Sequence, residues 1–221
     1  MKTFTKLQEG VYDPNIFKAI FLAGGPGSGK SYVVRRTTGG LGMKIVNSDD
    51  IYEKMLNDAG LEASPEDIFS DKGQEIRVRA KQVTKRMQGN FLTGRLGVII
   101  DGTGKDYDKI AKQVQGLRNI GYECSMIFVN TSIDTAQERN RMRSRTLPEK
   151  EVAKMWNEVQ RNIGKFQSLF GSKDFIVVDN NDAGEDVFNK VWKRIAMLIR
   201  KKVSNGIAKR WISQELAKKK R

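Results

Sequence analysis

A glycine-rich turn near the start of the chain carries the residues with the clearest chemistry. Gly24 is followed, after four intervening residues, by Gly29, Lys30 and Ser31, which fits the phosphate-binding pattern G-x-x-x-x-G-K-[ST]. Glycines let backbone N–H groups surround an anion, and the helix expected after the turn points its positive end at the same place. Lys30 supplies charge for the β- and γ-phosphates of a nucleoside triphosphate, and the Ser31 hydroxyl is a ligand for Mg²⁺. We therefore predict ATP and Mg²⁺ as cofactors, with nucleotide contacts from Gly25, Pro26, Gly27, Ser28, Gly29, Lys30, Ser31 and Tyr32.

Two carboxylates follow the second apolar segment, in the run Val46-Asn47-Ser48-Asp49-Asp50. Phosphoryl transfer to an alcohol needs a group that orients the hydroxyl and accepts its proton. The chain contains no histidine, so a carboxylate is the obvious base. We predict that Asp49 is this catalytic base and contacts the substrate. Asp50 is better explained as a negative charge that suits the first turn of a helix.

A third carboxylate, Asp101, ends the hydrophobic run Val98-Ile99-Ile100. P-loop proteins commonly support Mg²⁺ with an aspartate in this place, directly or through water. We predict that Ser31 and Asp101 form the metal site, and that Thr103 contacts the substrate or the γ-phosphate. The alternative is that Asp101 is buried and bonded to the loop lysine or serine.

Four arginines occur within seven residues, between two expected helices: Arg139, Arg141, Arg143 and Arg145. Guanidinium forks match phosphate oxygens and offset charge on a phosphoryl group in transfer. We predict an arginine-rich lid that closes over the nucleotide, in which Arg139 and Arg143 are catalytic. Arg139 would also contact the nucleotide, and Arg143 the substrate. A solvated basic turn is the alternative, since arginine is common on surfaces.

Apolar runs alternate with helical periodicity along the chain. The expected strands are residues 17–23, 43–47, 97–101, 123–129 and 175–179. The main expected helices are residues 29–36, one capped by Ser48, a long one from Asp71, 107–119, 132–143, one from Pro148 with an apolar stripe to Phe170, and 186–203. This order predicts an α/β P-loop NTPase fold, a five-stranded parallel sheet with helices on both faces. Ligands bind beyond the carboxyl ends of such strands, where we expect residues 24–31, 47–50, 101–105 and 179–181 to meet.

The charge of the chain favours a polyanionic partner. Its 40 basic and 26 acidic residues give a formal charge of +14, which fits a nucleic acid. Solubility and nucleotide affinity alone are the alternative. On the long helix, Arg77, Lys81 and Lys85 share one face, which fits either contacts with a phosphate backbone or a solvated surface.

At 221 residues we expect one main domain, residues 16–204, after a lead-in of residues 1–15 and before a basic tail of residues 205–221. The tail places apolar residues beside a run of four cations, which favours a short amphipathic helix over a disordered end. The single cysteine, Cys124, lies in an apolar run and is predicted to be an inert core thiol. We find no signal-peptide pattern or membrane-length apolar run, and expect a cytoplasmic protein without a membrane partner.

The motifs together resemble a known family. The glycine-rich loop, then Asn47-Ser48-Asp49-Asp50, then Asp101 with Thr103, then Arg139 with Arg143, are similar in order and spacing to bacteriophage polynucleotide 5′-hydroxyl kinases and the related zeta-toxin kinases. The resemblance runs from about Phe17 to Phe175. It implies that Asp49 is the general base, that Lys30 and Ser31 contact phosphate and Mg²⁺, and that Arg139 and Arg143 belong to the lid.

One position departs from this family. Polynucleotide kinases follow the paired aspartates with an arginine that grips the 3′-phosphate of the substrate, and here the matching residue is Tyr52. This leaves the acceptor open. Tyr52 is a candidate substrate contact that stacks on a base, or it packs on the core.

These observations favour an ATP-dependent kinase acting on a hydroxyl of nucleic acid, either a polynucleotide 5′-hydroxyl or a hydroxymethyl group on a modified base. One alternative is a kinase for a small molecule such as a nucleotide sugar. Another is a nucleotide-binding module without transfer activity. A nucleotide-driven motor is disfavoured, because no separate nucleic-acid domain and no carboxylate pair after the third strand are evident.

Overall fold

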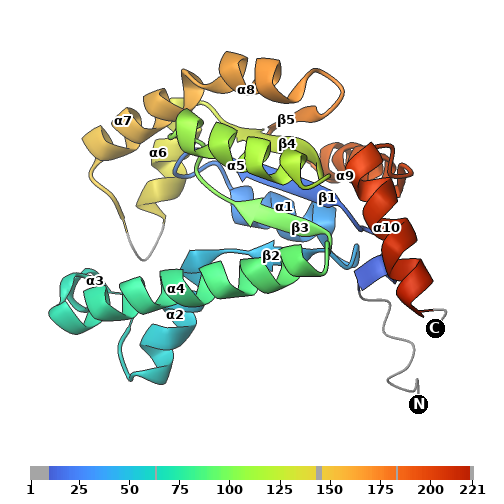
Figure 1. Ribbon diagram of the computed structural model, residues 1–221. Helices are drawn as coiled ribbons and strands as arrows, with labels where there is room; N and C mark the ends of the chain where they lie inside the picture. Colours follow the sequence, from blue (N-terminus) through green and yellow to red (C-terminus); the bar gives the residue numbers. More distant parts are fainter. Residues whose placement is uncertain (1–9, 63, 143–145, 183, 220–221) are drawn as a thin grey trace.

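The computed structural model describes residues 10–62, 64–142, 146–182 and 184–219. Five strands form one parallel sheet in the order β2-β3-β1-β4-β5 (Figure 1). Their bounds are β1 Lys18–Ala23, β2 Lys44–Val46, β3 Val98–Asp101, β4 Glu123–Asn130 and β5 Phe175–Asp179. The predicted α/β P-loop fold is therefore confirmed, because each pair of strands that are consecutive in the chain is joined through at least one helix.

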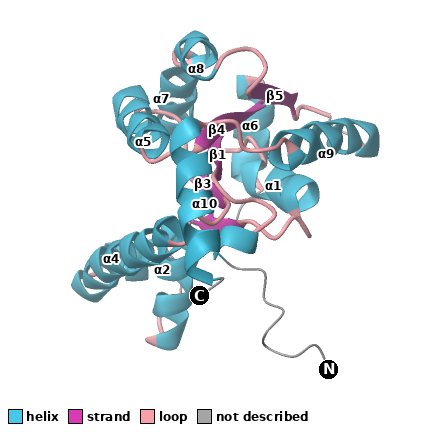
Figure 2. Ribbon diagram, turned by 45° about the vertical axis from the view of Figure 1, so that its right-hand side comes forward, coloured by secondary structure: helices cyan, strands magenta, loops and turns pink. Residues whose placement is uncertain are grey.

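Helices cover both faces of the sheet, as Figure 2 shows from the side. Their bounds are α1 Lys30–Thr38, α2 Ser48–Asp58, α3 Pro65–Phe69, α4 Asp71–Thr93, α5 Tyr107–Asn119, α6 Ile133–Arg141, α7 Glu149–Gln160, α8 Ile163–Phe170, α9 Glu185–Arg200 and α10 Gly206–Lys219. The helices α1 and α9 pack on one face, while α5, α8 and α10 pack on the other. None of the helices in the described residues has the length and apolar character needed to cross a membrane.

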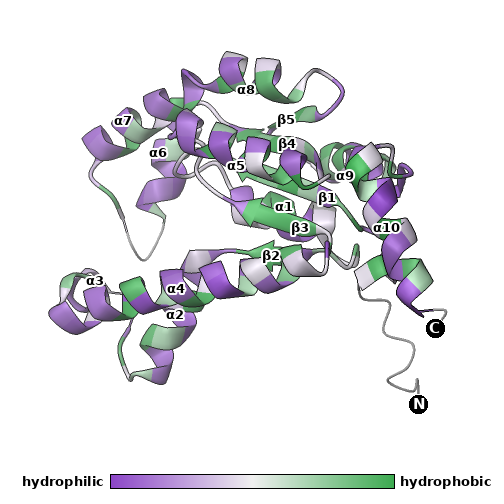
Figure 3. Ribbon diagram, viewed as in Figure 1, coloured by the Kyte–Doolittle hydropathy of each residue, from purple (hydrophilic) through white to green (hydrophobic). Residues whose placement is uncertain are grey.

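The strand β1 lies at the centre of the sheet, and all six of its residues are buried. Alternate side chains enter the two apolar clusters, Phe21 on the side of α5 and α8, and Leu22 on the side of α1 and α9. In Figure 3 the central strands are coloured as apolar, whereas the helices around them carry many hydrophilic residues. A rigid central strand of this kind fixes the loop that follows Ala23.

The helices α2, α3 and α4 form an arm with a small core of its own, made of Tyr52, Leu56, Ile68 and Ala80. This arm lies on the β2 side of the sheet, whereas α6 and α7 lie on the opposite side (Figure 1). Both groups flank the edge at which the strands end. The elements that carry the predicted base and the predicted lid therefore stand on either side of the phosphate-binding loop.

Three differences from the local predictions bear on the site. The first strand begins at Lys18, because Phe17 has a left-handed φ of 59° and donates its N–H to the carbonyl of Arg95 at 2.9 Å. The cap of α2 is Asn47 and not Ser48, which is the first helical residue. The apolar stripe expected in one helix is divided between α7 and α8 at the buried Asn162, whose side-chain amide donates to the carbonyl oxygen of Gly104 at 3.0 Å.

The segment after α9 is a helix, as predicted, and it packs on the main core. Ala208 of α10 is fully buried, and the Trp211 ring meets the Phe17 ring edge-on at 5.5 Å between centroids. The Arg95 guanidinium lies 5.9 Å from the centroid of the Trp211 ring. The helix α10 is thus fastened to the start of β1, with its cations Lys209 and Arg210 exposed.

Candidate functional site

The glycine-rich loop is packed so closely that its glycines are required. Gly27 and Gly29 have φ values of 72° and 73°, in the left-handed region that side chains disfavour. A Cβ atom on Gly27 would lie 2.3 Å from the carbonyl oxygen of Ala136, and one on Gly29 would lie 2.4 Å from the amide nitrogen of Asn180. The loop is therefore held against α6 and against the segment after β5.

The amino end of α1 is left open toward this loop. Gly29 is its N-cap and offers no side-chain hydrogen bond, and the first turn contains no acidic residue. By contrast, Asn47, Ser70 and Ser132 accept such bonds at the starts of α2, α4 and α6. The first-turn N–H groups of any helix have no helical acceptor, so those of α1 can donate to a bound anion.

Lys30, Asp101 and Asn47 meet beside the loop. The Lys30 ammonium group forms an ion pair with one carboxylate oxygen of Asp101, and the Asn47 amide donates to the other at 3.1 Å. Both charged side chains are mostly buried. This arrangement brings the ends of β1, β2 and β3 together, as the sequence predicted, and it shows the contact between Asp101 and the loop lysine. Ser31, the other predicted metal ligand, follows Lys30 directly and is exposed.

The two carboxylates of α2 differ in their surroundings. Asn47 accepts the Asp49 N–H at 2.8 Å, and its amide donates to the Asp50 carboxylate at 2.9 Å. Both side chains are exposed. Partial burial nevertheless raises the pKa of Asp50, and the nearby Asp101 carboxylate raises it further. Asp49 differs in that no hydrogen bond involves its carboxylate among the described residues. Sequence reasoning assigned Asp50 only to the helix terminus and therefore missed its coupling to Asp101.

Arg139 lies on the other side of the loop, against the segment after β5. Its Nη2 donates to the carbonyl oxygen of Asn181 at 2.9 Å, whereas Nη1 is buried without a partner in the described structure. The Asn180 amide donates to the carbonyl of Ser28 at 2.7 Å, and the Ser28 hydroxyl is also buried and unpartnered there. Sequence reasoning expected residues 179–181 at this edge but assigned no role to Asn180, which is 152 positions from its partner.

A cavity of about 440 Å³ opens between these groups. It is lined by Gly29, Tyr32, Arg139, Asn180, Asn181 and Asp182. Tyr32 is 55% exposed, and its ring meets Phe188 of α9 edge-on at 5.4 Å between centroids. The residues fit a nucleotide, because a cradle that a Cβ atom would fill adjoins two buried donors that lack acceptors.

Hydrogen bonds and an ion pair join the residues on the two sides of the arginine-rich segment. The Asn140 side chain donates to the carbonyl of Leu147 at 2.8 Å and accepts its N–H at 3.0 Å. Arg141 pairs with Glu149 at 2.6 Å, at the start of α7. Arg143 and Arg145 lie outside the described residues.

The two remaining predicted contacts have different settings. Tyr52 is 6% exposed and packs in the α2–α4 core, with the Arg77 guanidinium 4.7 Å from its ring centroid. Its place agrees with core packing, the second of the two sequence alternatives. Thr103 is exposed and its carbonyl accepts the Gly24 N–H at 3.1 Å, so it lies directly beside the loop. A cavity of about 210 Å³ adjoins Thr103 and Asp101.

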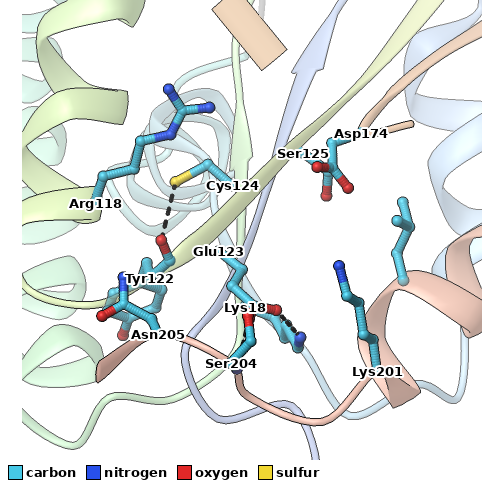
Figure 4. A pocket seen from close by; sticks show the side chains of 11 residues that line it. Lys18, Arg118, Tyr122, Glu123, Cys124, Ser125, Asp174, Lys201, Ser204 and Asn205 are labelled. Carbon is cyan, nitrogen blue, oxygen red and sulfur yellow. Dashed lines mark hydrogen bonds and ion pairs between the residues drawn. The ribbon is translucent and has the colours of Figure 1, made fainter. Parts of the chain in front are cut away.

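Another cavity, of about 360 Å³, lies at the opposite end of β1 and β4 (Figure 4). Lys18, Glu123, Ser204 and Lys201 are among its lining residues. Cys124 is buried beside it, and burial raises the pKa of its thiol to about 12, as suits an inert core residue. Since β1 spans six residues, about 20 Å separate this cavity from the glycine-rich loop.

The parallel sheet, the glycine-rich loop and the lysine at the start of α1 define an α/β P-loop protein. The chain belongs to the AAA domain family AAA_33, whose model matches residues 20–162, well over half of its length. No curated protein sequence matches the chain.

Solved structures share the fold at low sequence identity. One comes from the PezAT chromosomal toxin–antitoxin system of Streptococcus pneumoniae, with a TM-score of 0.60, 17% identity, and coverage of 84% of this chain and 85% of that chain. One belongs to the Pnkp1/Rnl/Hen1 RNA repair complex, with a TM-score of 0.53, 22% identity, and coverage of 68% and 46%. A gluconokinase from Sinorhizobium meliloti gives a TM-score of 0.50, 16% identity, and coverage of 83% and 94%. These likenesses establish the fold. The substrate has to be inferred from the residues of the site.

Proposed function

We propose that the protein is an ATP-dependent kinase that transfers the γ-phosphoryl group to a hydroxyl of nucleic acid. The observation that carries the proposal is the convergence of the open α1 terminus, the Lys30–Asp101 pair and Arg139 on one edge, beside the carboxylates of α2. Phosphoryl transfer depends on positioning and on the stabilisation of charge, and this edge supplies both.

The nucleotide would be held by residues 25–32, whose backbone donors and positive helix end face the phosphates. Lys30 would exchange its contact with Asp101 for the β- and γ-phosphates. Ser31 and Asp101 provide the oxygen ligands that Mg²⁺ prefers, and the bound ion would neutralise charge on the phosphates. The unpartnered Nη1 of Arg139 would reach a phosphate oxygen or the nucleotide beside Tyr32.

Asp49 would orient the acceptor hydroxyl and accept its proton. Its carboxylate is exposed and has no competing hydrogen bond in the described structure, so it is free to bind a substrate. Asp50 is engaged by Asn47 and faces the charge of Asp101, which suits a role in holding the site together. The two neighbours therefore provide a matched pair for mutagenesis.

The Asp49→Asn variant is expected to lower kcat by about 10²–10⁴-fold, the range of a general base. The Asp50→Asn variant should lose much less, since an asparagine can still accept from Asn47. Steady-state kinetics of both variants with the preferred acceptor measure the difference. If Asp50→Asn loses more activity than Asp49→Asn, Asp50 is the base. If neither variant loses activity, neither carboxylate acts in transfer, which favours a nucleotide-binding module.

Nucleic acid is the acceptor class that the charge of +14 and the order of motifs favour. The resemblance to polynucleotide and zeta-toxin kinases, together with a fold neighbour from an RNA repair complex, supports the same class. A small-molecule acceptor is the second candidate. It is favoured by the buried Tyr52 in place of a phosphate-gripping arginine, and by a gluconokinase fold neighbour covered over 94% of its length.

Incubation with γ-labelled ATP and a panel of acceptors tests the proposal. The panel contains single-stranded DNA and RNA with 5′-hydroxyl ends, DNA with hydroxymethylated bases, nucleosides and nucleotide sugars. We expect label on an oligonucleotide, and the Lys30→Met variant serves as the blank. If only a small alcohol is labelled, the acceptor is a small molecule and not nucleic acid. If ATP is hydrolysed and no member of the panel is labelled, the kinase proposal is contradicted.

A further inference from the structure

The helix α4 carries two rows of cations on opposite flanks. Arg77, Lys81 and Lys85 follow one another at intervals of four residues, and we call them the inner row. Lys72, Arg79 and Arg86 recur at intervals of seven residues, and we call them the outer row. At 100° per residue, the two rows lie on either side of the buried stripe of Gly73, Ala80 and Thr84. Each row carries three positive charges, and the two rows differ in which part of the molecule lies beside them.

The inner row begins beside the proposed acceptor site. Its first member, Arg77, lies over the Tyr52 ring at 4.7 Å from the centroid. Tyr52 stands three residues, or about one helical turn, after Asp49 on α2. From there the row runs along α4, and its ends are about 12 Å apart at 1.5 Å per residue. The outer row meets α2 at its other end, where the Lys72 ammonium donates to the carbonyl oxygen of Ala59, ten residues after Asp49, at 3.4 Å.

The polar groups at the start of the inner row lack partners. Arg77 Nε and the Tyr52 hydroxyl are both buried without a hydrogen bond in the described structure. Among the ion pairs of the described residues, none includes a cation of α4. Buried polar atoms are normally satisfied, and an unpaired guanidinium next to two free lysines indicates a missing anionic partner.

We propose that the inner row binds successive phosphates of a single strand of nucleic acid whose acceptor hydroxyl lies at Asp49. A line of cations on one helix flank contacts one backbone, and Arg77, held by Tyr52, is its fixed end. This inference rests on the proposed function for the position of the acceptor. The binding itself does not require transfer.

The test compares two double variants that remove equal charge from exposed positions of the same helix. Lys81→Gln with Lys85→Gln depletes the inner row, and Arg79→Gln with Arg86→Gln depletes the outer row. Binding of a short fluorescent single-stranded oligonucleotide is measured by anisotropy, without ATP, over a series of salt concentrations. Thermal melts confirm that both variants fold.

We expect the inner variant to reduce the slope of log K against log salt by about 1.4, since each phosphate contact on a single strand contributes about 0.7. The outer variant should leave most of the slope unchanged. Equal losses in both variants would mean a diffuse electrostatic field and would overturn the inference, as would a wild-type protein that does not bind the oligonucleotide at low salt.

Failure of this inference is distinguishable from failure of the proposed function. If the inner row governs binding but no oligonucleotide accepts label, the strand site stands and the kinase proposal fails. If an oligonucleotide accepts label with unchanged KM in the inner variant, the kinase proposal stands and the strand lies elsewhere.

Discussion

The two ends of the parallel sheet each hold a lysine paired with a carboxylate, and they differ in how completely the surrounding groups are satisfied. At the amino end, Glu123 pairs with the buried Lys18 and also accepts the N–H and the hydroxyl of Ser204, each at 2.9 Å. Burial alone would raise the pKa of Glu123, but the hydrogen bonds from Lys18 and Ser204 lower it. This end is a closed joint that ties the segment between α9 and α10 to β4.

At the carboxyl end, Lys30 pairs with Asp101, but some buried polar groups around this pair have no hydrogen-bond partner. The Ser28 hydroxyl and Arg139 Nη1 are buried without partners, and the pKa of Asp50 is raised. A protein leaves buried donors unpaired at a cost of about 1–3 kcal/mol each unless a ligand completes them. Arg95 Nε, near the start of β1, is also buried without a partner, but it does not take part in the Lys18–Glu123 pair. An ion pair alone therefore does not mark a functional site, whereas unsatisfied donors gathered at a phosphate-binding loop do.

Exchange of each lysine for methionine gives the largest contrast between the two ends. Lys30→Met should lower kcat/KM by at least about 10³-fold and weaken ATP binding, because the phosphates lose their principal charge. Lys18→Met should leave ATP affinity unchanged and cost about 3 kcal/mol of unfolding free energy, since it strands Glu123. Calorimetric ATP titration and urea unfolding measure the two effects. Full activity in Lys30→Met would refute the role of the loop.

Arg139 offers a second, smaller contrast, with Arg141 of the same helix as its control. Arg139→Gln should reduce kcat by about 10²–10³-fold, because an unpartnered guanidinium nitrogen at the loop is lost. Arg141→Gln removes an exposed pair with Glu149 and should change kcat less than about twofold. Single-turnover rates at saturating ATP measure the effect of each variant on transfer. Similar losses in both variants would mean that the segment acts through its net charge.

The sequence predicted the parts of the site that depend on local pattern. The loop, the strands and the meeting of Lys30, Asp101 and the residues after β5 follow from periodicity and from the geometry of parallel sheets. What it missed depends on contacts between distant segments. Asn47, the cap of α2, also donates its amide to Asp101, and Asn162, between α7 and α8, donates to the carbonyl of Gly104. Neither long-range contact can be read from the local pattern.

The smallest effect concerns the closed joint. In Glu123→Gln the charge that holds Lys18 is lost, and we expect a loss of about 1–3 kcal/mol of unfolding free energy with transfer activity unchanged. Because the pKa of Glu123 is lower in the folded state than its ordinary value of 4.5, its stabilisation is present above that value and disappears as the pH falls through the folded pKa. Urea unfolding over a pH series should therefore show a drop in acid that the variant lacks.

Asp174→Asn is the control for this joint, because Asp174 lines the same cavity and no ion pair includes it in the described structure. It should leave both the acid branch of the stability curve and the transfer rate as they are in the wild type. A loss of transfer in Glu123→Gln, at a pH and temperature where the variant is folded, would contradict the separation of the two ends. It would mean that β1 and β4 transmit the state of the amino-end joint to the phosphate-binding loop, and that the satisfied pair is part of the working site after all.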